Sequence, residues 1–196
     1  MIDISAKNIE GVWFGVACQG EEIFATNFAP DEKSVRDGLL RAIPFEVSFQ
    51  KLETPTPFAE RAIATLKDVY DGKGASGSLP FAMRHLSKYT TKVLKVASLI
   101  PLGYVASYGS VADVAGGSPR GVGRVMALNP FAPVVPCHRV VGSNFSLVGY
   151  GGGLHMKLEL LKRERRGYTS EREIAVGHER LRVFPVEFVL RKAGKE

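Results

Sequence analysis

The sequence predicts an α/β protein of the α+β kind: a small N-terminal antiparallel sheet with a helix, then a mainly helical C-terminal domain. Three observations support this prediction. Short apolar strands and a tight turn come first, a Gly/Ser-rich loop at Gly72–Gly77 follows, and short helical segments separated by Gly and Pro fill the second half. The 196 residues suffice for two small domains.

The N-terminal sheet is predicted from two segments rich in apolar and aromatic residues, Val12–Cys18 and Glu22–Phe28. They flank Gln19 and Gly20, which suit the tight turn of an antiparallel hairpin. A third short strand near Pro44–Phe49 would extend this sheet. These three segments therefore predict a small sheet, in which the first two strands form a tight hairpin.

A helix is predicted to begin at Thr56 and Pro57, with threonine as the cap and proline in the first turn. Its apolar face comprises Phe58, Ile63, Leu66 and Tyr70, and it ends at Gly72. Since the Gly/Ser-rich loop follows, we predict a domain boundary near residue 85, with an N-terminal α/β domain at 1–85.

The second domain, predicted at 86–164, begins with a helix that Pro101 terminates. Short helices at Ser110–Ala115 and Arg120–Leu128, joined by the turn Gly116–Pro119, have the outline of a helix-turn-helix. A final helix carries an apolar face of Leu154, Leu158 and Leu161. Residues 165–196 form an extension of unknown role, in which Leu181–Leu190 alternates like a strand broken by Pro185.

Charge is unevenly distributed. Residues 1–85 carry 9 basic and 12 acidic groups, a net −3, whereas residues 86–164 carry 9 and 3, a net +6. Residues 165–196 carry 8 and 5, a net +3. A basic middle segment is typical of a nucleic-acid interface, although many basic faces are only solvated.

Composition narrows the protein class further. No apolar run approaches the ~20 residues that span a bilayer and no secretory signal is evident, so we predict a cytoplasmic protein without a membrane partner. Two cysteines make neither a disulfide framework nor a Cys-x-x-Cys pair, so no metal is expected. With only 4 Asn and 2 Gln, the composition leans toward a thermophile.

The chemistry is concentrated in Pro136-Cys137-His138-Arg139-Val140. A cysteine is nucleophilic only as the thiolate, and an unperturbed pKa near ~8.5 leaves it mostly protonated at neutral pH. His138 could take the proton directly or through a water, and Glu164 could orient the imidazole. The other cysteine, Cys18, has no such neighbours.

Around this thiol, Asn129–Val140 and Gly149–Leu154 resemble the active-site signature of the O6-alkylguanine-DNA alkyltransferases, also called methylated-DNA–protein-cysteine methyltransferases. Ile100–Tyr108 is similar to the family's segment leading into its helix-turn-helix. The resemblance spans Val93–Glu164. It departs upstream, where Ser87–Thr90 stands in place of the usual Gly-Thr-x-Phe-Gln, which puts the entry to the helix in question.

The resemblance implies a ribonuclease H-like N-terminal domain and DNA repair by direct damage reversal. Cys137 would accept the alkyl group of O6-alkylguanine in double-stranded DNA, with O4-alkylthymine left open, after minor-groove binding and base flipping. The resulting thioether would end the protein's activity after one turnover. A monomer that needs no cofactor is expected.

The site residues that the resemblance implies fall into three groups. The catalytic group is Cys137, His138, Glu164, Tyr108 and Lys157; the DNA-binding group is Arg120, Tyr108, Gly121, Gly123 and Arg124; the substrate-binding group is Val140, Tyr150, Gly151, Asn129 and Met126.

Several of these residues have implied roles. Arg120 would fill the gap in the base stack, and Tyr108 would press on the adjacent phosphate and bond the extruded base. Gly121 and Gly123 would let helix and DNA backbone approach closely. Lys157 would either favour the thiolate or lie on a solvated helix face.

The remaining residues are interpreted structurally or as parts of the base pocket. Asn129 would tie the second helix of the pair to the active-site strand, and Arg139 would be an ion-pair partner. Met126 is interpreted as packing or pocket wall. The Val140 carbonyl and the Gly151 amide would contact the base.

Three other functions stay open on the sequence. An alkyltransferase-like protein would bind lesions without transfer, a cysteine hydrolase using Cys137, His138 and Glu164 would turn over repeatedly, and a helix-turn-helix regulator would prefer a DNA sequence.

Overall fold

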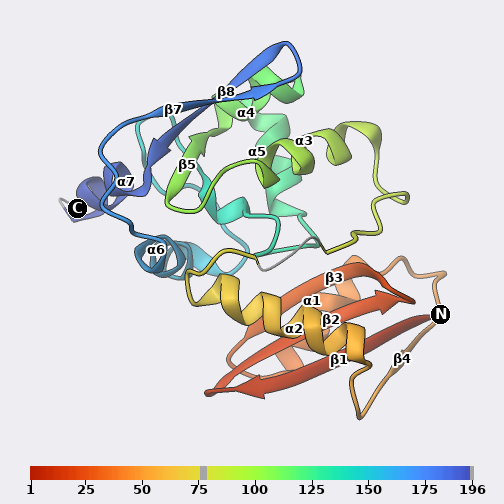
Figure 1. The fold of residues 1–196 in the computed structure, drawn as a ribbon. Helices are drawn as coiled ribbons and strands as arrows, with labels where there is room; N and C mark the ends of the chain where they lie inside the picture. Colours follow the sequence, from red (N-terminus) through yellow and green to blue (C-terminus); the bar gives the residue numbers. More distant parts are fainter. Residues whose placement is uncertain (76–78, 195–196) are drawn as a thin grey trace. The chain divides into compact units, whose positions relative to one another are not determined.

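The computed structural model describes residues 1–75 and 79–194 (Figure 1). The chain forms two compact units. The first contains Met1–Tyr70, Gly74–His85 and Pro130–Val134, and the second contains Asp71–Lys73, Leu86–Asn129 and Val135–Glu196. The predicted loop Gly72–Gly77 lies partly outside the described residues.

The first unit contains a four-stranded sheet in the order β3-β2-β1-β4. Its strands are β1 (Ile2–Ile9), β2 (Val12–Gln19), β3 (Glu22–Ala29) and β4 (Phe49–Lys51). The predicted hairpin is confirmed, because β2 and β3 pair antiparallel. The third strand was predicted too early in the chain, since β4 begins at Phe49 and pairs parallel with β1, a strand not predicted.

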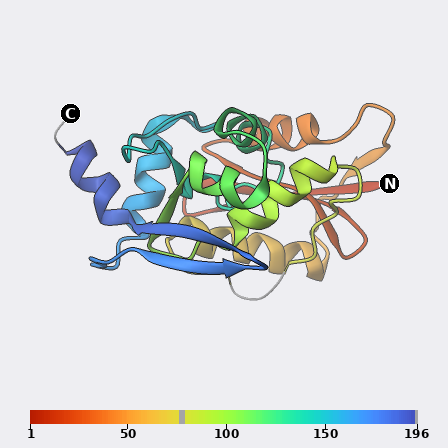
Figure 2. The same ribbon diagram turned by 90° about the horizontal axis from the view of Figure 1, so that it is seen from above.

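Two helices cover opposite faces of this sheet (Figures 1 and 2). α1 (Glu32–Ala42) was not predicted, although Asp31 caps it by accepting from the Ser34 amide at 2.8 Å. α2 (Pro57–Tyr70) begins as predicted, with the Thr56 hydroxyl accepting from the Ala59 amide at 3.2 Å. Gly15 in β2 allows α1 to pack closely, because a Cβ there would lie 2.3 Å from Val35.

The second unit has its own four-stranded sheet, in the order β6-β5-β8-β7. Its strands are β5 (Tyr104–Ser107), β6 (Val140–Val141), β7 (Arg172–Val176) and β8 (Glu179–Pro185). β5 pairs parallel with β6 and antiparallel with β8. The prediction of a mainly helical second half missed this sheet, because its strands are short and two of them come from the C-terminal extension.

Five α-helices and one short 3₁₀ helix accompany this sheet among the described residues. They are α3 (Lys88–Ser98), α4 (Tyr108–Ala115), α5 (Pro119–Ala127), η1 (Cys137–Arg139), α6 (Gly153–Arg163) and α7 (Val186–Ala193). Serine side chains cap three of them: Ser87, Ser107 and Ser118 accept from the backbone amide three residues later. In the part of the chain described, the helices are too short or too polar to cross a membrane.

The strand predicted for Leu181–Leu190 is correct only for its first half. β8 ends at Pro185, and Val186 begins α7, in which Val186 and Val189 are buried. Alternating apolar residues favoured a strand, but buried positions three residues apart are equally typical of a helix.

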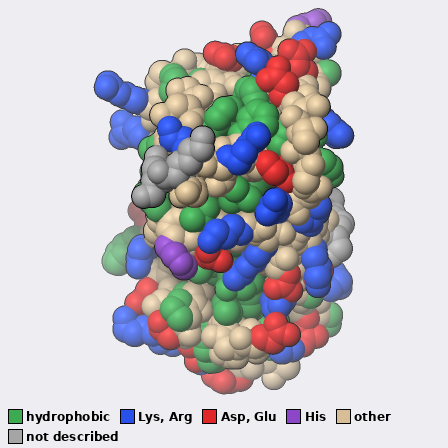
Figure 3. Space-filling view, turned by 90° about the vertical axis from the view of Figure 1, so that its left-hand side faces the viewer, with side chains coloured by type: hydrophobic (Ala, Val, Ile, Leu, Met, Phe, Trp, Pro, Cys, Tyr) green, Lys and Arg blue, Asp and Glu red, His purple; other side chains and the backbone are tan. Residues whose placement is uncertain are grey.

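The extension presents a charge-mixed surface. Arg180 and Arg182 on β8 lie 3.3 Å from Glu173 and Glu171, respectively. Figure 3, which views the left-hand side of Figure 1, shows Lys and Arg side chains interspersed with Asp and Glu. Exposed pairs of this kind contribute little to stability.

Tyr89 in α3 packs beside the turn between α4 and α5. A Cβ at Gly117 would lie 2.7 Å from the Tyr89 hydroxyl oxygen, and one at Gly121 would lie 2.8 Å from it. Within the described chain this buried hydroxyl has no hydrogen-bond partner. Gly121, predicted to allow close approach of DNA, is therefore constrained first by the protein's own tyrosine.

Tyr89→Phe is expected to raise the free energy of unfolding by about 1 kcal/mol, because it removes a buried, unpaired hydroxyl. Urea unfolding measures this change. As a control, Gly121→Ala should destabilise the protein, and less so when combined with Tyr89→Phe. A lower stability of Tyr89→Phe alone would contradict the prediction.

Candidate active site

Cys137 opens the 3₁₀ turn η1, directly before β6. The turn is tight because the Cys137 amide donates to the Val135 carbonyl at 2.8 Å and the Arg139 amide donates to the Pro136 carbonyl at 2.9 Å. Cys137 is 5% exposed. The pairing of β6 with β5 thus sets the thiol at the edge of the second sheet.

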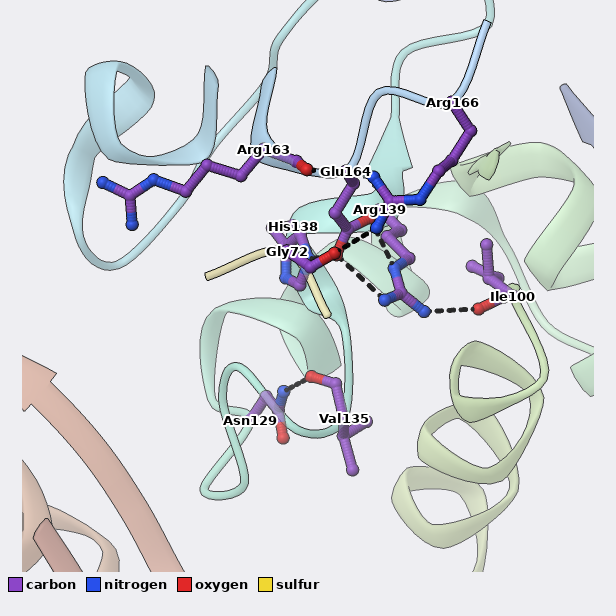
Figure 4. A network of polar contacts seen from close by, with 9 residues as sticks. All are labelled: Gly72, Ile100, Asn129, Val135, His138, Arg139, Arg163, Glu164 and Arg166. Carbon is purple, nitrogen blue, oxygen red and sulfur yellow. Dashed lines mark hydrogen bonds and ion pairs between the residues drawn. The ribbon is translucent and has the colours of Figure 1, made fainter. Parts of the chain in front are cut away.

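A buried polar network is formed by the two residues that follow Cys137 in the chain and by Glu164 (Figure 4). His138 Nε2 is 2.8 Å from Oε1 of Glu164, the C-cap of α6, and both side chains are fully buried. Arg139 donates to both oxygens of the same carboxylate, at 2.9 Å each, and to the Ile100 carbonyl at 2.7 Å. The ion-pair role predicted for Arg139 is confirmed.

The network holds Glu164 ionised. Burial alone would raise the pKa of the Glu164 carboxyl, but His138 and Arg139 outweigh it and lower that pKa to about 2. Burial lowers the pKa of His138, against the opposing influence of Glu164. The imidazole is therefore neutral at pH 7.

The carboxylate also selects the tautomer of His138. An ionised carboxylate only accepts hydrogen bonds, so Nε2 carries the proton and Nδ1 keeps its lone pair. Nδ1 is buried, and the described residues offer it no hydrogen-bond partner. It is an available proton acceptor, and a buried water there would satisfy it.

The Cys137 thiol is protonated at neutral pH. Burial raises its pKa, although a hydrogen bond from Asn129 and the charge of Lys157 act in the opposite direction. The pKa of the second thiol, Cys18, is raised to about 12 by burial and by the charge of Asp3. Of the two, only Cys137 lies near groups that favour a thiolate.

Lys157 in α6 is fully buried, so the solvated helix face considered from the sequence is wrong. Its ammonium donates to the carbonyls of Val140, Val148 and Gly149 at 2.6, 2.8 and 3.4 Å. Burial lowers its pKa to about 8. Lys157 therefore ties β6 to the segment that precedes α6.

Tyr108, the first residue of α4, reaches the same segment. Its hydroxyl donates to the Val148 carbonyl at 3.1 Å, and the Lys157 ammonium lies 5.8 Å from its ring centre. Burial raises the pKa of Tyr108 to about 12. The phenol thus remains a proton donor at neutral pH.

The α5 residues predicted to bind DNA differ in exposure. Arg120 and Arg124 are exposed, and a Cβ at Gly123 would make an ordinary contact with Tyr108, 3.8 Å away. Met126 on the same helix, which was predicted as packing or as a wall of the base pocket, is buried, with 7% of its surface exposed. Among these residues the two arginines are available to a partner.

Asn129 and Val140, two of the residues predicted to bind the base, adjoin the thiol turn. Asn129 donates to the Val135 carbonyl at 2.8 Å, which is the predicted tie between α5 and this turn. The Val140 carbonyl already accepts from Lys157. Tyr150 is half-buried, and burial raises its pKa well above the usual value, whereas Gly151 is exposed.

Sequence reasoning missed the acceptors of this site. The carbonyls of Ile100 and Val148 hold Arg139, Tyr108 and Lys157. Backbone carbonyls carry no residue signature, so no pattern in the sequence could have identified them.

Residues 88–166 match the family model described as "6-O-methylguanine DNA methyltransferase, DNA binding domain", which defines the class of protein. A methylated-DNA–protein-cysteine methyltransferase of Mycolicibacterium paratuberculosis is 40% identical over 116 residues, which cover 58% of this chain and 69% of that relative. The chain belongs to the methylated-DNA–protein-cysteine methyltransferase family of enzymes.

Other matches are to proteins of the same family, over shorter or less identical alignments. The enzyme of Pyrobaculum aerophilum is 55% identical over 65 residues, 33% of this chain and 44% of that relative. Among solved structures, Mycobacterium tuberculosis OGT in complex with DNA aligns with a TM-score of 0.67 and 26% identity over 83% of this chain and 92% of that one. The methyltransferase of Pyrococcus kodakaraensis has a TM-score of 0.62 and 26% identity, covering 84% and 99%.

Proposed function

We propose that this protein repairs O6-alkylguanine in double-stranded DNA by moving the alkyl group irreversibly onto Cys137. The observation that carries this proposal is the buried His138, whose Nδ1 is unpaired among the described residues while its Nε2 is held 2.8 Å from Glu164. This arrangement supplies a proton acceptor on the residue that follows the buried thiol in the chain. O4-alkylthymine is a candidate second substrate.

In the proposed reaction, His138 Nδ1 takes the thiol proton through a water while Cys137 Sγ attacks the alkyl carbon. The new S–C bond forms as the C–O6 bond breaks, and guanine leaves with the electron pair and is then protonated. Tyr108, whose phenol stays protonated, would turn its single proton from the Val148 carbonyl toward the departing base. Since a thioether has no simple route back to a thiol, each molecule acts once.

For the DNA interface, we propose that α4 and α5 act as a helix-turn-helix on the minor groove. Because O6 of a stacked guanine is out of reach of the thiol, transfer also requires base flipping. Support comes from the exposure of Arg120 and Arg124 on α5 and from the basic charge of residues 86–164. Arg120 would occupy the gap left by the extruded base. The neighbouring structure bound to DNA supports DNA as the partner.

For the base pocket, we propose that the carbonyls of Cys137 and Val140 accept from the exocyclic amine of guanine. Tyr150 would line this pocket, and the Gly151 amide would contact O6. A carbonyl oxygen has two lone pairs, so Val140 can accept from both the base and Lys157.

Four accompanying proposals rest on the sequence and on its resemblance to the family. The protein would act as a monomer, in the cytoplasm of a thermophile, and without a cofactor. The small number of Asn and Gln, 4 and 2, favours the thermophile.

Intact-protein mass spectrometry after incubation with a duplex containing O6-methylguanine tests the function. We expect one added methyl group per molecule, located on Cys137, and a yield that stops at one equivalent. Binding without a mass change would indicate a lesion-binding protein. Product formation beyond one equivalent would indicate a hydrolase, and preference for a sequence over a lesion would indicate a regulator.

A further inference from the structure

Three phenylalanines from distant parts of the chain form a cluster in the second unit. The ring of Phe145 lies 5.2 Å from that of Phe184 at 70° and 5.3 Å from that of Phe188 at 81°. Both are edge-to-face contacts, the favoured geometry for aromatic pairs. Phe145 lies between β6 and α6, whereas Phe184 in β8 and Phe188 in α7 belong to the C-terminal extension.

Phe145 has a left-handed backbone with φ of 63°, which is uncommon for a bulky residue. Its amide donates to the Gly142 carbonyl, and the Gly142 amide donates to the Ser146 carbonyl, each at 2.9 Å. Such a conformation persists only when its surroundings hold it. The contacts of the Phe145 ring with the extension contribute to holding this turn.

The turn leads directly into the active site. Val148, three residues after Phe145, offers the carbonyl that accepts from Tyr108 and Lys157. Gly149 follows and accepts from the same ammonium at 3.4 Å. The segment 142–149 is thus anchored on one side by catalytic candidates and on the other by the ring of Phe145.

The extension is itself firmly joined to the second sheet. β8 pairs with β5 in a register that places Phe184 opposite Val105, and the Val186 amide donates to the Gly103 carbonyl at 2.9 Å. Val186 and Val189 are fully buried with Val105 and share its hydrophobic cluster. Phe184 and Phe188 therefore stand on ordered elements, beyond residue 166 where the family match ends.

We propose that Phe184 and Phe188 are positioning residues for alkyl transfer, acting through Phe145 to brace the segment 142–149. This inference rests on the proposed function, because the braced segment matters for transfer only if Cys137 is the acceptor. The extension thereby has a role in transfer: Phe184 and Phe188 pack against Phe145 and exclude solvent from that side of the segment 142–149. The segment then presents the Val148 carbonyl to Tyr108 and Lys157 in one geometry.

The test compares Phe188→Leu, Phe145→Leu and the double variant with the wild-type protein. Each single variant should slow methyl transfer to Cys137 in single-turnover experiments by about 2- to 10-fold. This fold-change corresponds to the interaction free energy of one aromatic pair. Amides of residues 144–149 should exchange hydrogen faster, and duplex affinity should stay unchanged. The double variant should be no slower than the slower single variant, because both substitutions remove the same contact.

Tyr168→Leu is the matched control. Tyr168 belongs to the same extension and stacks on Tyr104 at 5.0 Å, without an aromatic contact to Phe145. Its substitution should leave transfer and exchange at 144–149 unchanged. A purely structural role of the extension predicts equal losses in Tyr168→Leu and Phe188→Leu.

The proposed role of Phe184 and Phe188 would be overturned by unchanged exchange at 144–149 in Phe188→Leu, or by accelerated exchange with an unchanged transfer rate. Additive effects in the double variant would also contradict it. Failure of the wild-type protein to methylate Cys137 would instead refute the proposed function, and the exchange data would still report whether the extension holds the segment.

Discussion

Replacing Cys137 by serine is expected to reduce methyl transfer by more than about a thousandfold, since losing a catalytic nucleophile has effects of this size or greater. A serine hydroxyl is a far weaker acid than a thiol, and the neutral His138 cannot ionise it to a useful extent. The substitution is nearly isosteric, so it leaves the buried site packed. Binding to a duplex containing O6-methylguanine should therefore remain.

Transfer and binding are measured on the same duplex, by mass spectrometry and fluorescence anisotropy. Cys18→Ser is the control: Cys18 is buried on β2, and its thiol pKa is raised to about 12, so this variant should transfer at the wild-type rate. Transfer retained in Cys137→Ser, or lost in Cys18→Ser, would place the acceptor elsewhere.

The second large effect is expected from Glu164→Gln, which leaves Arg139 buried without its carboxylate. Breaking a buried ion pair on one side costs about 3–5 kcal/mol of folding stability. The neutral amide also ceases to select the His138 tautomer, so transfer should slow as well. Both effects follow from the two hydrogen bonds of Arg139 and the one of His138 to this side chain.

The contribution of Glu164 should depend on pH. Its folded-state pKa is lowered from 4.5 to about 2, so the stabilisation is fully present above pH 4.5 and is lost as the pH falls toward 2. At 1.36 kcal/mol per pKa unit, the difference in free energy of unfolding between wild type and Glu164→Gln should shrink by about 3 kcal/mol across this window.

Denaturant unfolding at several pH values measures this difference. Glu159→Gln is the matched control on the same helix, because Glu159 pairs with Lys162 at the surface, at 2.8 Å. Its substitution should change stability little at any pH. A difference between wild type and Glu164→Gln that stays constant from pH 5 to pH 2 would show that the carboxylate is not held ionised by its neighbours.

Local features of the fold were predictable from the sequence. The hairpin at Gln19 and Gly20 and the helix start at Thr56 were predicted correctly, because turns and caps depend on neighbouring residues. Residues 186–190 were assigned to a strand, although they form the start of α7, because the burial of Val186 and Val189 depends on packing against other elements.

The candidate site was predictable as a set of residues but not as a geometry. The family resemblance and the candidate acceptor thiol were predictable, because they depend on residue identity and order. Arg139 was interpreted correctly as an ion-pair partner, but its partner was not identified. Glu164 was predicted as a candidate to orient His138, but their contact across 26 residues and the full burial of Lys157 are established by the folded chain. The tertiary structure also decided that Phe145 rests on the extension. Burial and non-local contacts arise when separate elements pack together, and a local sequence pattern does not encode which elements will meet.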